Sequence, residues 1–94
     1  MKFTYLPSAQ TGLDWFRLYY GQIFPEGRKN ARDHYFKMKR ALRAAPMLGK
    51  PIGENGDREY TIPRTPFSVI YRIRDNTIEV RLVIDQRAER PGVY

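Results

Sequence analysis

The feature that most constrains the fold of this chain is a change of hydrophobic period along its length. Between residues 9 and 45, apolar side chains recur at steps of three and four, the spacing of one helix face. Between residues 67 and 84 they recur at every second position, the spacing of one face of a strand. Helices and strands in separate blocks indicate an α+β fold. The chain has 94 residues, enough for one core, so we expect a single domain over 1–94.

The helical block divides into two helices at Phe24–Gly27, where Pro25 and Gly27 end the first helix. We expect Ser8 to cap this first helix, and the second helix to run from Arg28 to Ala45. The two buried faces should consist of Ala9, Leu13, Phe16, Tyr20 and Ile23, and of Ala31, Tyr35, Met38, Leu42 and Ala45. Matched apolar stripes and a short connection predict an antiparallel helical hairpin over 8–45.

The remaining segments predict strands. Residues 2–6 form a first strand that ends at Pro7, and the Gly- and Pro-rich stretch Pro46–Asp57 reads as an irregular loop. A three-stranded antiparallel sheet over 58–85 follows, giving the order β-α-α-β-β-β and leaving 86–94 as a C-terminal tail. Its first strand is Arg58–Ile62, with Tyr60 and Ile62 inward.

A two-residue turn at Asp75-Asn76 fixes the register of the last two strands, because both residue types tolerate positive φ. Arg74 then faces Thr77, and Tyr71 faces Val80. Ile73 faces Ile78 and Arg72 faces Glu79. The inward-facing side chains should be Phe67, Val69, Tyr71, Ile73, Ile78, Val80, Leu82 and Ile84.

Charge and composition narrow the possible functions. Seventeen Lys and Arg against ten Asp and Glu give a net charge of +7, so the partner should be an anion, either nucleic acid or an acidic protein. The chain has no Cys, and His34 is its single imidazole, which argues against a zinc site or a Ser-His-Asp triad. We expect no metal and no cofactor. The polar N-terminus and the lack of a long apolar run predict a cytoplasmic protein that does not bind membranes.

Three groups of residues are candidates for binding. Arg28, Arg32, Lys39 and Arg43 form one stripe on the second helix, extended by Lys29 and Arg40, although a solvated helix face would look similar. On the polar face of the strand hairpin, Arg72 opposite Glu79 reads as an ordinary ion pair, whereas Arg74 and Arg81 have no acidic partner in this register. In the tail, Arg87 and Arg90 could grip phosphates while Tyr94 stacks on a base, unless the tail is merely frayed. His34 reads as a surface residue.

The C-terminal third also resembles a known family. The segments Asp57-Arg58-Glu59-Tyr60, Pro66–Ile73, Ile78-Glu79-Val80 and Asp85-Gln86-Arg87 are similar to the ParE branch of the RelE/ParE toxins. That branch shows an Arg-Glu pair, an aliphatic-Tyr-Arg strand, an alternating strand and a basic ending. Leu13-Asp14 in the first helix and Pro46 at the loop fit as well, so the resemblance covers nearly the whole chain.

The resemblance implies a toxin that is held in check by an antitoxin, whose acidic, amphipathic C-terminal segment covers the helical hairpin in a hetero-oligomer. The residues expected to bind antitoxin or target are Arg28, Arg32, Lys39, Arg43, Arg58, Arg72, Arg87 and Arg90. Members of the ParE branch inhibit DNA gyrase and cause growth arrest, whereas members of the RelE branch cleave mRNA on the ribosome.

RelE-type nucleases place cations at the positions matching Glu59, Thr61 and Ser68, and none of these is basic here. This favours gyrase inhibition without a catalytic centre. The alternative is a ribosome-dependent endoribonuclease that uses Arg72, Arg81, Arg87 and Tyr94. A third reading is a folded, antitoxin-bound member that is no longer toxic.

Overall fold

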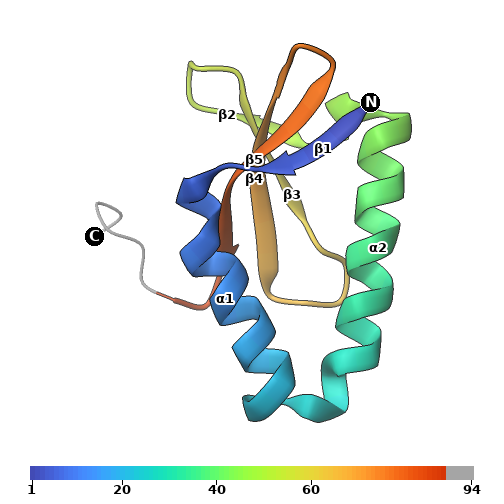
Figure 1. Ribbon diagram of the computed structural model, residues 1–94, viewed down its shortest axis with the longest axis vertical. Helices are drawn as coiled ribbons and strands as arrows, with labels where there is room; N and C mark the ends of the chain where they lie inside the picture. Colours follow the sequence, from blue (N-terminus) through green and yellow to red (C-terminus); the bar gives the residue numbers. More distant parts are fainter. Residues whose placement is uncertain (89–94) are drawn as a thin grey trace.

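The computed structural model describes residues 1–88, which form a five-stranded mixed sheet covered on one face by two helices (Figure 1). The strands are β1 (Lys2–Tyr5), β2 (Lys50–Ile52), β3 (Asp57–Thr61), β4 (Phe67–Arg74) and β5 (Thr77–Asp85). The helices are α1 (Gln10–Leu18) and α2 (Arg28–Ala44), joined to the rest by the short turns η1 (Pro7–Ala9), η2 (Tyr19–Ile23), η3 (Pro25–Gly27) and η4 (Pro46–Leu48). The α+β class is as expected.

The sheet is larger than the three-stranded antiparallel sheet expected from the sequence. Its order is β1-β5-β4-β3-β2, with β1 parallel to β5 at one edge and β2 antiparallel to β3 at the other. The stretch expected to be an irregular loop therefore contributes η4 and the edge strand β2. β2 has three residues including Pro51, a sequence in which no alternation could be detected. The β1–β5 pairing joins residues about 75 positions apart, so no local pattern indicates it.

The register of the β4–β5 hairpin is confirmed at all four predicted pairs, from Arg74 opposite Thr77 to Tyr71 opposite Val80. The turn residues Asp75 and Asn76 have φ of 50° and 56°, as a type I′ turn requires. Turn chemistry and hydrophobic alternation agree here, which makes the register specific.

Beyond this point a β-bulge overturns the predicted alternation on β5. Tyr71 pairs with Val80 but Ile70 pairs with Leu82, so Arg81 is an extra residue on β5. The extra residue exchanges the two faces of the strand. Val83 is buried, whereas Leu82 is 42% exposed and Ile84 leaves the core. The prediction that Leu82 and Ile84 point inward was therefore wrong. Ile73, near the tip of the hairpin, is also exposed.

The first helix differs from its prediction at both ends. Ser8 is not a cap, because its Oγ donates to the carbonyl oxygen of Arg81 at 2.6 Å, and η1 begins the helical segment one turn earlier. At the other end α1 passes into a π-helical turn, η2, which inserts an extra residue into the helical period. Ile23 is rotated off the buried face and is 55% exposed. The second helix is close to its prediction, with Ala31, Met38 and Leu42 buried and Ala45 exposed.

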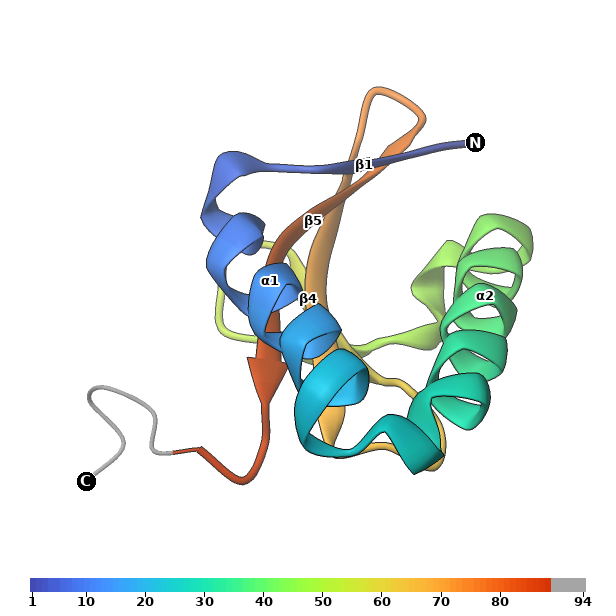
Figure 2. The same cartoon turned by 60° about the horizontal axis from the view of Figure 1, so that its bottom comes forward.

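Both helices pack on the sheet more than on each other. They run in opposite directions, as expected of a hairpin, but they diverge across the same face of the sheet (Figures 1 and 2). α1 lies directly on β5, where Gly12 comes so close to Val83 that a Cβ atom would overlap the Val83 carbonyl. Ala9, Leu13 and Tyr20 join Met38, Leu42 and the inward residues of β4 and β5 in one core. None of the helices in residues 1–88 has the length and apolar character needed to cross a membrane.

Candidate functional site

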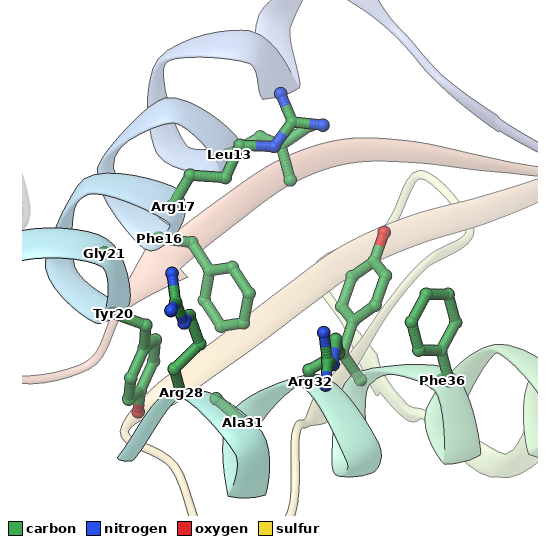
Figure 3. Close-up of a pocket in the computed structure, with 10 residues that line it drawn as sticks. Leu13, Phe16, Arg17, Tyr20, Gly21, Arg28, Ala31, Arg32 and Phe36 are labelled. Atoms are coloured by element: carbon green, nitrogen blue, oxygen red, sulfur yellow. The ribbon is translucent and has the colours of Figure 1, made fainter. Parts of the chain in front are cut away.

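The divergence of the helices leaves a groove between them with a cavity of about 330 Å³ (Figure 3). α1 and η2 contribute one wall and α2 the other, and Phe16 from α1 and Arg28 from α2 point toward each other across the space between them. The residues that line it are Leu13, Phe16, Arg17, Tyr20, Gly21, Arg28, Ala31, Arg32, Tyr35 and Phe36. We refer to these ten residues as the interhelical groove.

The floor of the interhelical groove is aromatic and held in place by the sheet. The Phe16 ring packs edge-on against Phe67 of β4 with centroids 4.9 Å apart, and against Tyr20 at 5.2 Å. Tyr35 approaches Phe16 from α2 at 5.8 Å. Because Phe67 is fully buried, these rings are fixed from below, and the apolar floor is formed before any partner arrives.

The rim of the groove is cationic. Arg17, Arg28 and Arg32 are exposed, and none of them makes an ion pair or hydrogen bond within residues 1–88. Three unneutralised guanidinium groups around an apolar floor favour a partner that brings both carboxylates and apolar side chains.

The cationic rim continues along α2 towards β1. Lys39 Nζ lies 5.1 Å from the centroid of the Phe3 ring, and Arg43 lies 5.8 Å from the same ring. The predicted stripe of Arg28, Arg32, Lys39 and Arg43 therefore divides along α2, with Arg28 and Arg32 at the groove and Lys39 and Arg43 beside the Phe3 ring of β1. Lys29 is not part of it, because it pairs with Asp33 at 2.8 Å and this hydrogen bond lowers the pKa of the Asp33 carboxyl.

Tyr35 places one polar atom in the apolar floor. Burial raises the pKa of Tyr35 to about 12, so the phenol stays protonated at neutral pH. Its hydroxyl makes no hydrogen bond to any of residues 1–88, which leaves it free to donate to an incoming oxygen.

Arg58, which was predicted to bind a partner, makes two hydrogen bonds within the chain. Its Nη1 donates to the carbonyl oxygens of Met47 at 3.1 Å and Gly49 at 2.8 Å. Beside it the buried Tyr71 hydroxyl donates to the Pro46 carbonyl at 2.6 Å and accepts the Gly49 N–H at 2.9 Å. Burial raises the pKa of Tyr71. The Arg and Tyr of the two family-like strand motifs therefore hold η4 against the sheet.

The uncovered face of the sheet carries two ion pairs. Arg72 Nε lies 2.7 Å from Glu79, as predicted for an ordinary cross-strand pair. Arg81 was expected to lack an acidic partner, but its Nη1 lies 2.6 Å from Asp57. The expectation was wrong because Asp57 comes from β3, and the two-stranded register could not include it. Both arginines are thus neutralised by carboxylates.

Arg87 is the third paired arginine. It binds both oxygens of Asp85 at 3.0 Å, donates to the Tyr19 hydroxyl at 2.8 Å and stacks 4.4 Å from the Tyr19 ring. Trp15 Nε1 donates to the same carboxylate at 3.0 Å. The hydrogen bonds from Arg87 and Trp15 lower the pKa of Asp85 to about 2, and Asp85 raises the pKa of Arg87. This cluster fastens the end of β5 to α1. Arg90 and Tyr94 lie outside the described residues.

Two of the positions matching the cations of RelE-type nucleases, Thr61 and Ser68, belong to a neutral cluster with Gln86. Ser68 Oγ lies 3.1 Å from Thr61 Oγ1, and Gln86 Nε2 donates to Ser68 at 2.7 Å and to Thr61 at 3.2 Å. The Thr61 and Ser68 hydroxyls and the Gln86 amide thus serve as hydrogen-bond partners for one another. His34 is partly buried on α2, and residues 1–88 contain no cluster of side chains able to hold a metal ion.

Sequence reasoning missed Arg17 and Phe36, two residues that line the groove. Arg17 follows Phe16 at the border of the apolar stripe, and Phe36 follows Tyr35 in the same way. The hydrophobic period predicts little about residues at the border of an apolar stripe, because whether they line a groove depends on how far the two helices diverge.

Comparison with known proteins finds similarity among solved structures. No family model matches the chain, and a search of curated proteins finds no match either. Among solved structures, a chain described as "Chromosomal ParDE TA system from P. aeruginosa" superposes with a TM-score of 0.68 at 25% identity, over 90% of this chain and 95% of that one. This similarity in fold and sequence supports a ParE-like toxin of a toxin–antitoxin system.

Proposed function

We propose that this chain is the toxin of a bacterial type II toxin–antitoxin system and acts in the cytoplasm as a ParE-like inhibitor of DNA gyrase. In this proposal a cognate antitoxin neutralises it by laying an acidic, amphipathic segment into the interhelical groove. Toxin and antitoxin then form a hetero-oligomer.

The interhelical groove is the observation that carries the proposal. An amphipathic helix places apolar side chains on one face and charged ones beside them, which matches an aromatic floor flanked by Arg17, Arg28 and Arg32. The Tyr35 hydroxyl offers an additional donor to the same segment. Burying this floor would also stabilise a small domain, since a ligand at a hundredfold excess over its Kd adds about 2.7 kcal/mol.

Gyrase inhibition is favoured over mRNA cleavage by the state of the arginines on the sheet. A nuclease needs free cations to stabilise the charge that develops on phosphate. Arg72, Arg81 and Arg87 are each bound to a carboxylate, and the hydroxyl cluster at Thr61 and Ser68 carries no charge. These pairings support a protein that acts by binding.

The antitoxin interaction is tested with matched charge reversals on α2. The toxin is titrated against the purified product of the adjacent short open reading frame, and the Kd is measured by calorimetry. Arg32→Glu should weaken binding roughly tenfold or more, because it sets a carboxylate against an acidic segment. Lys37→Glu, an exposed cation on α2 that does not line the groove, should leave the Kd within about twofold. Equal effects of the two changes would contradict the assignment of the groove.

The target is tested by two assays run in parallel on the purified toxin. We expect DNA supercoiling by purified gyrase to be lost at excess toxin while in vitro translation proceeds. Codon-specific cleavage of translated mRNA, seen by primer extension, with supercoiling intact would establish the nuclease instead. Induction of the chain without growth arrest would indicate a folded member that is no longer toxic.

A further inference from the structure

The short turn η4 at the end of α2 presents two large apolar side chains to solvent. Met47 is 63% exposed and Leu48 is 52% exposed. η4 lies at the end of α2 away from the α1–α2 connection (Figure 1). Phe36, the last groove residue on α2, lies eight positions before the end of that helix at Ala44, about 12 Å at a helical rise of about 1.5 Å per residue, and η4 follows beyond it. A segment bound in the interhelical groove therefore need not cover η4.

The backbone of η4 is fixed from beneath by two side chains of the sheet. Tyr71 binds the Pro46 carbonyl and the Gly49 N–H, and Arg58 binds the carbonyls of Met47 and Gly49. A further hydrogen bond joins the Leu48 N–H to Ala45. Gly49 itself is in contact with the Tyr71 ring, with no room for a side chain. The turn is thus anchored on both sides of its two exposed residues.

This anchoring stabilises the fold, but it does not require apolar side chains at positions 47 and 48. Polar side chains at positions 47 and 48 would leave every one of these backbone hydrogen bonds intact. Apolar side chains on a preorganised backbone lose little conformational entropy on binding, which is the property of residues that dominate a protein–protein contact.

The charge of the surrounding chain indicates the kind of partner. From His34 to Gly53 there is no acidic residue, and five cations occur: Lys37, Lys39, Arg40, Arg43 and Lys50. Glu59 lies opposite Lys50 in the β2–β3 register, so the positive field comes chiefly from α2. Methionine and leucine neither stack on bases nor hydrogen-bond to them, which favours a protein with an acidic surface over a nucleic acid.

We propose that Met47 and Leu48 are the contact through which the toxin engages its protein target, at an acidic surface with an apolar pocket. This inference rests on the proposed function and separates two surfaces of one small domain. The interhelical groove binds the antitoxin, and η4 binds the target.

The test measures both interactions with the same variants of the whole chain. Fluorescently labelled toxin is titrated with purified DNA gyrase by anisotropy, and in parallel with the antitoxin. The double change Met47→Ser and Leu48→Ser should weaken gyrase binding roughly tenfold or more, because hot-spot side chains contribute most of the affinity. Its antitoxin Kd should stay within about twofold, which also reports an intact fold. The matched control is Leu18→Ser and Ile23→Ser, two other exposed apolar residues, and should leave gyrase binding unchanged.

Each remaining outcome overturns the proposal in a recognisable way. If the double variant binds gyrase as tightly as the wild type does, η4 does not contact the target, and the proposed function still stands. Loss of antitoxin binding instead assigns η4 to the antitoxin. Loss of affinity for a DNA duplex, with gyrase protein binding kept, assigns it to nucleic acid. No gyrase binding by the wild-type chain refutes the gyrase target and, with it, this contact.

Discussion

Replacing Tyr71 by phenylalanine removes one oxygen atom that makes two hydrogen bonds in a fully buried site. The Pro46 carbonyl and the Gly49 N–H both lose their partner, while Arg58 still holds the Gly49 carbonyl. An unsatisfied buried backbone group costs about 1–3 kcal/mol, and the phenylalanine ring recovers part of this because it is cheaper to bury. We therefore expect a loss of about 2 kcal/mol in the free energy of unfolding, or roughly 10 °C in Tm for a domain of this size.

Urea unfolding followed by the fluorescence of Trp15, the single tryptophan of the chain, measures this loss. Tyr60→Phe is the matched control, since the Tyr60 hydroxyl makes no hydrogen bond to residues 1–88, and it should change the free energy of unfolding by less than about 0.5 kcal/mol. If the Tyr71 and Tyr60 variants unfold with equal free energies, the two hydrogen bonds do not hold η4 as argued.

Three further changes test the packing and the ion pairs. Gly12→Ala should destabilise the fold by more than about 2 kcal/mol despite the better helix propensity of alanine, because the new methyl group overlaps the Val83 carbonyl. Gly21→Ala is the control in the same urea assay. It should be neutral or stabilising, because the space around Gly21 is open. Because the pKa of Asp85 is lowered to about 2, its contribution to the free energy of unfolding is present above about pH 4 and is lost as the pH falls towards 2. Asp85→Asn should therefore lower the free energy of unfolding by about 1 kcal/mol at pH 7 and by almost nothing near pH 2. A difference that persists at pH 2 would refute the ionic origin. Leu82→Lys should leave Tm within about 3 °C, because the bulge has turned this side chain to solvent, and a large drop would place Leu82 in the core.

The parts of the fold that could be predicted from sequence are those set by neighbouring residues. The Asp75-Asn76 turn fixed the β4–β5 register because two residues that tolerate positive φ sit between alternating strands. α2 was placed to within one residue by its apolar period and by Pro46 after it.

The features that the sequence did not predict are irregularities within an element and contacts between distant segments. The π-helical turn after Leu18 and the bulge at Arg81 each insert one residue into a regular period, and nothing in the local pattern marks them. Arg81 found its carboxylate on a strand outside the hairpin. The groove was predicted as a basic stripe beside an apolar face, but its depth depends on how far the helices diverge over the sheet.

The pairing of β1 with β5 also affects when the domain can fold during synthesis. Residues 2–5 lie beside residues 77–80, and β5 is the central link between β1 and the rest of the sheet. The nascent chain therefore has no edge to which β1 can be added until β5 has left the ribosome. Such long-range pairing slows folding and keeps apolar segments exposed in the meantime. In the proposed toxin–antitoxin pair, an antitoxin made at the same time would meet the helices before the sheet closes. Neutralisation would then begin during translation.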